Sequence, residues 1–108
     1  ISMLDTTKYQ ILTYCFFNNV QISVADLDCL TLLALLGKEE LTTFCKTSVE
    51  KGVFKSPQSA RNAITKAEKK GLIEKQGKNK KTIKIDGKLN IQVAPCVLLD
   101  FKILGQHK

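Results

Sequence analysis

The chain has 108 residues, of which 44% are hydrophobic and 25% charged, and its formal net charge is +7 at pH 7. This length fits one domain with one small core, and the hydrophobic content excludes a chain that is disordered throughout. A basic balance favours a polyanionic partner, with nucleic acid ahead of an anionic membrane surface. The excess is concentrated in residues 38–88, where fourteen Lys or Arg stand against six Asp or Glu. Such a local excess predicts an anion-binding face.

Neither a membrane segment nor a metal or catalytic centre is predicted. The longest apolar runs, ILTYCFF and LTLLALL, are far shorter than the ~20 residues that a spanning helix needs. The four cysteines form no C-x-x-C pair and there is one histidine, so a zinc site is not expected. With no nucleophile–base pair and no Gly-rich phosphate loop, we expect no enzyme activity and no cofactor.

The cysteines also indicate in which cellular compartment the protein is expected. They are Cys15, Cys29, Cys45 and Cys96, and each has apolar neighbours. Free buried thiols in a reducing cytoplasm are the favoured interpretation. Two disulfides in a secreted domain are the alternative.

The first predicted element is a strand over residues 8–17, KYQILTYCFF, within an N-terminal arm at 1–22. This segment is rich in β-branched and aromatic residues, which favour strands. Tyr9, Leu12 and Phe16 also share one face at helical spacing, so a helix is the alternative.

Two helices are predicted next, over residues 24–36 and 38–50. Ser23 followed by Asp26 is a variant of the capping box, and Gly37 suits the end of the first helix. That helix is apolar on nearly all sides, which predicts burial on more than one side. Its outer leucines are expected to serve either the core or the seam of a homodimer. They are Leu32, Leu35 and Leu36.

A third helix is predicted over residues 57–70. Ser56-Pro57 is a strong start signal, and Gly71 ends the pattern. On a helical wheel one face is small and apolar, and the opposite face is polar and basic. The apolar face consists of Ala60, Ala63, Ile64 and Ala67.

A β-meander is predicted after this helix. A strand begins at Leu72-Ile73, residues 77–80 form a turn, and residues 82–85 return as a strand. Asp86-Gly87 is the strongest hairpin signal in the chain, and it predicts another strand over KLNIQV. The run CVLLDFKIL then predicts a further strand or an arm.

The order of these motifs is similar to that of a known superfamily. A polar helix with Ser56, Ser59, Arg61 and Asn62 near its start closes with Glu68-Lys69-Lys70-Gly71-Leu72-Ile73 before a basic hairpin. Residues 24–85 thereby resemble the winged helix-turn-helix superfamily, most closely bacterial regulators of the MarR and GntR kind. Ala67 stands where that pattern usually has Leu.

The resemblance implies an α+β winged helix-turn-helix, with three helices followed by a β-meander wing. We expect one domain over residues 1–108, with its core at 24–85, extra strands in the N-terminal arm, and C-terminal strands at 86–108. The third helix is implied to enter the major groove of duplex DNA, and the wing to contact phosphate.

The predicted DNA contacts lie on the third helix and the wing. Asn62 and Gln58 are suited to adenine, and Arg61 to guanine. The lysines of the wing suit phosphate better than base edges. The full predicted set is Ser56, Gln58, Ser59, Arg61, Asn62, Thr65, Lys66, Lys69, Lys75, Lys78, Asn79, Lys80 and Lys81, and Lys84 either joins it or faces water from its strand.

The expected function is double-stranded DNA binding, by a cytoplasmic transcriptional regulator or a replication- or mobile-element-associated protein. The expected partner is duplex DNA, with a homodimer left open and no membrane contact. A winged helix used for protein assembly is the first alternative, and the unassigned chain ends and the helix at 24–36, which is apolar on nearly all sides, motivate it. A basic RNA-binding module ranks third, because Phe54 is the only aromatic residue between positions 45 and 100.

Overall fold

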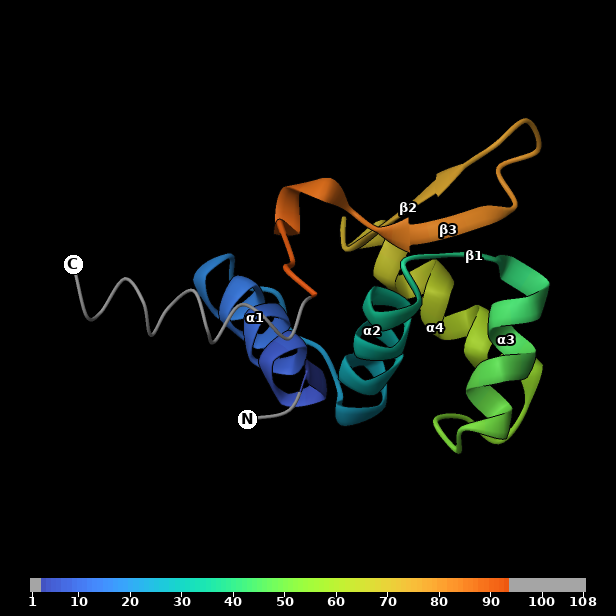
Figure 1. Cartoon of the computed structure of the whole chain (residues 1–108), viewed down its shortest axis with the longest axis horizontal. Helices are drawn as coiled ribbons and strands as arrows, with labels where there is room; N and C mark the ends of the chain where they lie inside the picture. Colours follow the sequence, from blue (N-terminus) through green and yellow to red (C-terminus); the bar gives the residue numbers. More distant parts are fainter. Residues whose placement is uncertain (1–2, 94–108) are drawn as a thin grey trace.

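The computed structural model describes residues 3–93, which form an α+β fold (Figure 1). Its helices are α1 (Met3–Phe17), α2 (Val24–Leu36), α3 (Leu41–Glu50) and α4 (Pro57–Lys69), followed by a short 3-10 helix, η1 (Gly87–Leu89). Its strands are β1 (Lys38–Glu40), β2 (Ile73–Gln76) and β3 (Thr82–Ile85). They form one antiparallel sheet in the order β1-β3-β2.

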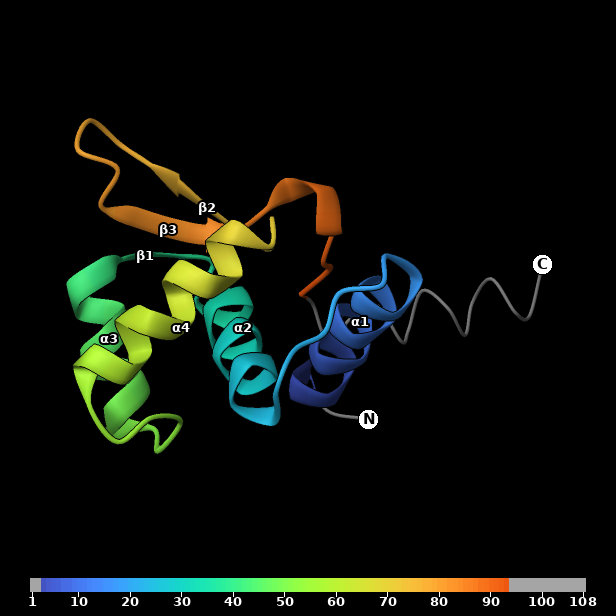
Figure 2. The same ribbon diagram turned by 180° about the vertical axis from the view of Figure 1, so that it is seen from behind.

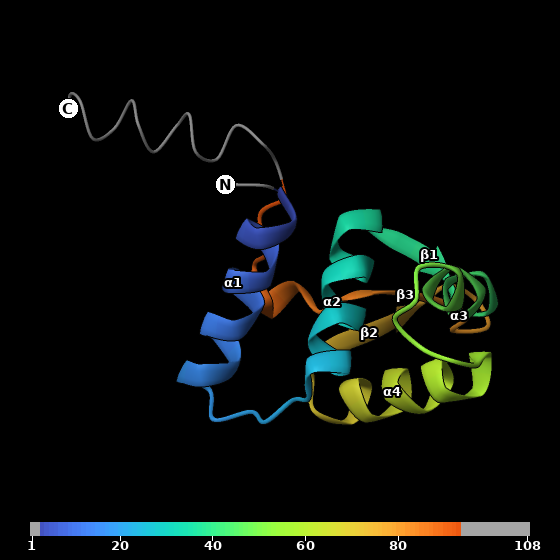
Figure 3. The same ribbon diagram turned by 90° about the horizontal axis from the view of Figure 1, so that it is seen from below.

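Helix α2 lies at the centre of the fold. It contacts α1, α3, α4, β1 and β3, and Figure 3 shows α1 and α3 on opposite sides of it. The core gathers around α2 and includes Leu30, Leu33, Phe44, Ile64 and Ile83, all essentially buried. The prediction of an α2 buried on more than one side is confirmed, because its apolar residues point at several neighbours at once.

The helices predicted over residues 24–36 and 57–70 are confirmed as α2 and α4. Both bonds of the capping box form at α2, since Ser23 Oγ accepts from the Asp26 amide and Asp26 Oδ2 accepts from the Ser23 amide, each at 3.1 Å. Gly37 then ends α2 with φ +85°, a left-handed conformation that costs glycine little. Local capping chemistry therefore fixes both ends of this helix.

The strand predicted over residues 8–17 is wrong, because this segment belongs to helix α1. Thr7, Ile11 and Cys15 recur every four residues and are buried against the rest of the core. Packing of this stripe against α2 outweighs the β propensity of the segment. The face that suggested a helix, Tyr9 and Phe16 among it, is the exposed one.

The predicted helix over residues 38–50 begins three residues late. Lys38–Glu40 is strand β1, which pairs with β3 so that Glu39 lies opposite Ile83. Glu40 then caps α3, with its Oε1 accepting from the Thr43 amide at 2.9 Å. Gly37 has already turned the chain toward the sheet, so these residues extend along β3 before the helix starts.

The strand predicted after Asp86-Gly87 is also wrong for the described residues 86–93. Asp86 Oδ1 accepts from the Lys88 amide at 3.1 Å and so caps η1 in place of closing a hairpin. This single turn buries Leu89 against the core, and Asn90 leaves it with φ +52°. The predicted strand or arm from Cys96 onward lies outside the described residues.

The expectation of free, buried thiols is confirmed for the described cysteines. Cys15, Cys29 and Cys45 are free and buried, whereas Cys96 lies outside the described residues. Burial raises the pKa of the Cys29 thiol to about 12, and the charges of Asp26 and Cys45 add to this shift. In residues 3–93 no helix is long and apolar enough to cross a membrane.

Candidate nucleic-acid interface

Helix α4 forms where the sequence predicts it and presents the predicted faces. Ser56 Oγ accepts from the Ser59 amide at 3.2 Å, and Pro57 occupies the first turn, where its missing amide hydrogen leaves no bond unmade. Gly71 ends the helix with φ +77°. The small residues of the inner face are buried, so α4 packs closely on α2 and α3. They are Ala60, Ala63, Ile64 and Ala67.

The outer face of α4 is polar and basic. Its exposed residues are Gln58, Ser59, Asn62, Thr65, Lys66 and Lys69. Gln58 Nε2 donates to Asn62 Oδ1 at 3.0 Å, which links two side chains one turn apart. The hydroxyls of Ser56 and Ser59 lie 3.0 Å apart, and Thr65 Oγ1 donates to the Arg61 carbonyl at 3.0 Å. These serine and threonine hydroxyls are thus partly occupied within α4.

Arg61 lies between α4 and α3 instead of on the outer face. Its side chain is only partly exposed, and its Nη2 donates to Thr42 Oγ1 at 2.9 Å. Thr42 stands in the first turn of α3, beside the capping residue Glu40. Arg61 therefore fastens the start of α3 to the middle of α4, a role that sequence spacing alone does not reveal.

Glu40 gives this corner a negative charge. Its pKa is lowered, first by the hydrogen bond from the Thr43 amide and then by the bond from the Thr43 hydroxyl. The charges of Lys81 and Arg61 lower the pKa further. The corner between α3, α4 and the sheet thus holds an ionised carboxylate beside two cations, and the cations outnumber it.

The basic hairpin, residues 73–85, consists of β2, a turn and β3. Ile73 pairs with Ile85, and Gln76 with Thr82. The turn opens at Gly77, whose φ of +92° favours glycine. Four exposed residues make up its tip, and within residues 3–93 none of its lysines forms a salt bridge. The tip consists of Lys78, Asn79, Lys80 and Lys81.

The base of the basic hairpin is electrically balanced, unlike its tip. Lys75 Nζ lies 3.3 Å from Glu68 Oε1, and Lys84 Nζ lies 3.5 Å from Glu74 Oε1. Lys75 is therefore tied to the end of α4, and Lys84 to the neighbouring strand. Within residues 3–93, the lysines of the basic hairpin that form no salt bridge are therefore those of its tip.

Helix α4 and the tip share a region of the molecule. Figures 1 and 2 show the tip and the N-terminal half of α4 at the end where α3 lies, with α1 at the opposite end. Two lysines near the other end of α4 have structural contacts. Lys70 Nζ donates to the Gln21 carbonyl at 2.5 Å, and Lys88 lies over Gly71.

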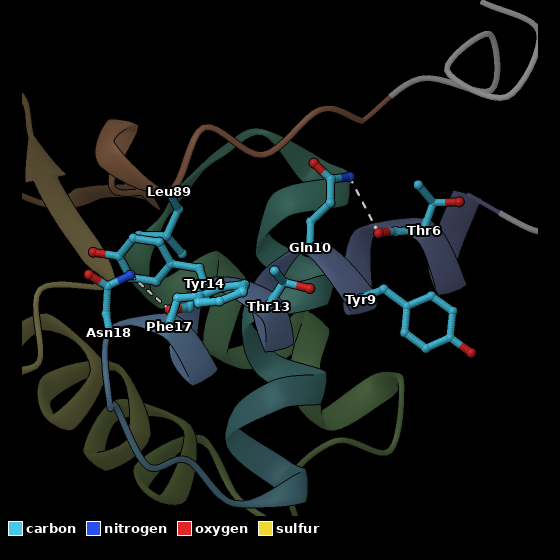
Figure 4. Close-up of a pocket in the computed structure, with 8 residues that line it drawn as sticks. All are labelled: Thr6, Tyr9, Gln10, Thr13, Tyr14, Phe17, Asn18 and Leu89. Carbon is cyan, nitrogen blue, oxygen red and sulfur yellow. Dashed lines mark hydrogen bonds between the residues drawn. The ribbon is translucent and has the colours of Figure 1, made fainter. Parts of the chain in front are cut away.

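A second surface lies along α1, away from α4. It is a groove of about 580 Å³ lined mainly by α1, with Leu89 of η1 on its other side (Figure 4). Tyr14, Phe17 and Asn18 stand near Leu89, and Tyr9 lies toward the other end of the groove. Sequence reasoning assigned this segment to a strand and so missed the groove. The aromatic residues of ILTYCFF were the sequence feature that could have indicated an exposed apolar surface here.

The remaining chemistry of residues 3–93 is sparse. That part of the chain contains no group of three or more His, Cys, Asp or Glu side chains placed to hold a metal ion. Comparison of the chain with family models, with curated proteins and with solved structures finds no match. The candidate interface consists of the outer face of α4, the α3–α4 corner and the tip of the basic hairpin.

Proposed function

We propose that this chain is a double-stranded DNA-binding protein of winged helix-turn-helix architecture. Helix α4 enters the major groove, and the tip of the basic hairpin grips backbone phosphate. The order α2, β1, α3, α4, β2, β3 with an antiparallel sheet supports this architecture. A cytoplasmic transcriptional regulator, or a protein of replication or of a mobile element, fits such an activity.

One observation carries the proposal. The exposed face of α4 consists of hydrogen-bonding and basic side chains, and at the same end of the molecule is a turn with three exposed lysines that form no salt bridge within residues 3–93. An α-helix fits the width of the major groove, where amide side chains can recognise base edges. Exposed lysines that are not held in salt bridges can contact phosphate and release its counterions, which is a main source of affinity for DNA.

A salt titration tests the proposal. Fluorescence anisotropy of a labelled duplex should show affinity falling as salt rises from 50 to 200 mM. For four to five phosphate contacts the slope of log K against log salt should be about −4. Absence of binding to any duplex at low salt would contradict the proposal. Tighter binding to single-stranded or A-form RNA of equal length would favour the RNA-binding alternative.

A second candidate function, assembly with another copy of the chain through α1, rests on a separate observation. Phe16 is 80% exposed, Phe17 77% and Tyr9 61%, and all three belong to α1. Tyr9 and Phe17 also line the groove of Figure 4. Lys8, the one lysine of α1, pairs with Asp28 at 3.3 Å, so its charge is compensated there. Two copies can therefore meet through α1 without opposing their basic faces.

Sedimentation equilibrium tests this second candidate. The full chain should show a concentration-dependent dimer, and Phe16→Glu should shift it to monomer. Val24→Glu is the matched control, since Val24 is also 77% exposed but lies on α2. A monomer at every concentration, or a dimer that Phe16→Glu leaves intact, would exclude assembly through α1.

A further inference from the structure

We propose that Gln58 and Asn62 act as one adenine-reading unit, and that Arg61 positions α4 instead of reading a base. The proposal rests on the DNA binding proposed above and names the base that α4 selects. Its basis is the contact between the two amides, in which Gln58 Nε2 donates to Asn62 Oδ1 at 3.0 Å. Both side chains are exposed on the outer face of α4.

The contact fixes which atoms of the two amides face a ligand. Each amide has one carbonyl oxygen that accepts and one NH₂ group that donates two hydrogen bonds. The contact uses one hydrogen of Gln58 and the oxygen of Asn62. The oxygen of Gln58 is left as an acceptor and the NH₂ group of Asn62 as a donor, and Gln58 keeps one further N–H. Within residues 3–93, the contact with each other is the hydrogen bond that these two side chains form.

This pair of atoms is complementary to adenine. In the major groove adenine presents N7 as an acceptor and the N6 amino group as a donor. Asn62 Nδ2 can donate to N7 while Gln58 Oε1 accepts from N6. Guanine presents two acceptors, N7 and O6, so its O6 would face the Gln58 oxygen with no hydrogen between them. Cytosine and thymine each offer a polar partner to only one of the two amides.

Arg61 has a different task in this arrangement. Its Nη2 donates to Thr42 Oγ1 at 2.9 Å, and its charge helps to lower the pKa of Glu40 on the α3 side. This bond directs the guanidinium toward α3, whereas the two amides bond to each other along α4. Arg61 is therefore a positioning residue that sets α4 against α3, and its loss should weaken binding to all sequences alike.

The experiment begins with the full chain and a pool of random duplexes. Sequences that bind are enriched, and each position of the enriched site is then replaced by the other three base pairs. Wild-type protein should prefer adenine at one position by about 5- to 150-fold, the range for a good two-bond contact. Replacing that adenine by 7-deazaadenine, which lacks N7, should weaken wild-type binding.

Variants separate a joint reader from two independent residues. Gln58→Ala and Asn62→Ala should each remove most of the adenine preference, and the double variant should remove no more. Asn62→Ala should bind the 7-deazaadenine duplex as tightly as the adenine duplex, because it already lacks the group that donates to N7. Gln21→Ala is the matched control, because Gln21 is an exposed amide on the α1–α2 linker and should keep the preference. Arg61→Ala should lower affinity for every duplex while the preference stays, and Arg61→Lys should restore part of the affinity.

The outcomes distinguish this inference from the proposed function. A pool that binds with the expected salt dependence but enriches no adenine would overturn the inference and leave DNA binding intact. An adenine preference that survives both single substitutions, or one lost in Arg61→Ala, would overturn it as well. No binding to any duplex would contradict the proposed function and the inference together. Circular dichroism of each variant verifies that the helices are retained.

Discussion

At the residue scale, the ionised side chain of Glu40 stabilises the folded state. Its carboxylate accepts from the Thr43 amide at 2.9 Å and from the Thr43 hydroxyl at 3.0 Å. These hydrogen bonds, with Lys81 and Arg61, hold the pKa of Glu40 below its ordinary value. A carboxyl with a lowered pKa in the folded state stabilises that state once it is ionised.

We therefore expect acid to weaken the fold through Glu40. The contribution of Glu40 is present above the pKa of an unfolded glutamate, about 4.3, and is lost as pH falls through the lower folded value. In Glu40→Gln the midpoint of urea unfolding should be lower at pH 7 and should fall less between pH 5 and pH 3 than in the wild type. Equal pH dependence in the two proteins would contradict this role.

The buried thiols lead to a second prediction at this scale. Cys29 is buried and its pKa is raised to about 12, so almost none of it is the reactive thiolate at neutral pH. Brief alkylation of native protein should leave Cys15, Cys29 and Cys45 unmodified, and the same treatment in guanidinium should modify all three. Peptide mass spectrometry distinguishes them, and rapid native labelling of Cys29 would disprove its burial.

At the element scale, Ser56 is first of all the cap of α4. Its hydroxyl accepts from the Ser59 amide, which would otherwise lack a partner in the first turn. Ser56→Ala should lower the free energy of unfolding by about 1 kcal/mol, and Ser56→Gly by only a few tenths. Urea unfolding measures both. Equal losses in the two variants would show that the hydroxyl does not act as a cap.

Variants of the basic hairpin can test whether the lysines of its tip, and not those of its base, bind phosphate. Replacing Lys78, Lys80 and Lys81 together by Ala should reduce the salt slope of DNA binding by about 3, because each lysine removed leaves one phosphate without its cation. Lys84→Ala is the control, because Glu74 already compensates that charge. An unchanged slope in the triple variant would mean that the tip does not bind phosphate.

The elements predicted correctly are those whose ends are encoded locally. Ser23 with Asp26 starts α2, Ser56-Pro57 starts α4, and glycine ends both patterns, so nearby residues suffice. Helix α1 was missed because its apolar residues occur on all sides and only packing on α2 selects the buried ones. Strand β1 was missed because Lys and Glu are poor strand formers, and it exists through pairing with β3.

For the candidate interface too, the features set by local sequence were predicted and those set by tertiary contacts were not. Helical periodicity predicted which residues of α4 point outward, and turn chemistry predicted the exposed lysines of the tip. The bond from Arg61 to Thr42 spans 19 residues of sequence and joins two helices, so it depends on how α3 and α4 cross. The ion pair of Lys75 with Glu68 depends likewise on how β2 leaves α4. Such tertiary partners decide which charged groups remain free.

At the scale of the whole molecule, the two ends differ in character. The tip of the basic hairpin and the N-terminal half of α4 lie toward one end, and α1 lies at the other (Figures 1 and 2). Helix α1 carries the exposed aromatic residues Tyr9, Phe16 and Phe17. DNA binding and self-association would then use separate surfaces. A dimer formed through α1 would carry two copies of α4, as a site with two half-sites requires.

The central claim is that the α4 end of the molecule binds duplex DNA. Titration of ¹⁵N-labelled protein with an unlabelled duplex enriched from the random pool tests this most directly, through the shifts of backbone amide resonances. We predict that the largest shifts fall on residues 57–69 and 77–81, and that they fade as salt is raised. Shifts confined to α1, or no shifts at low salt, would contradict the claim.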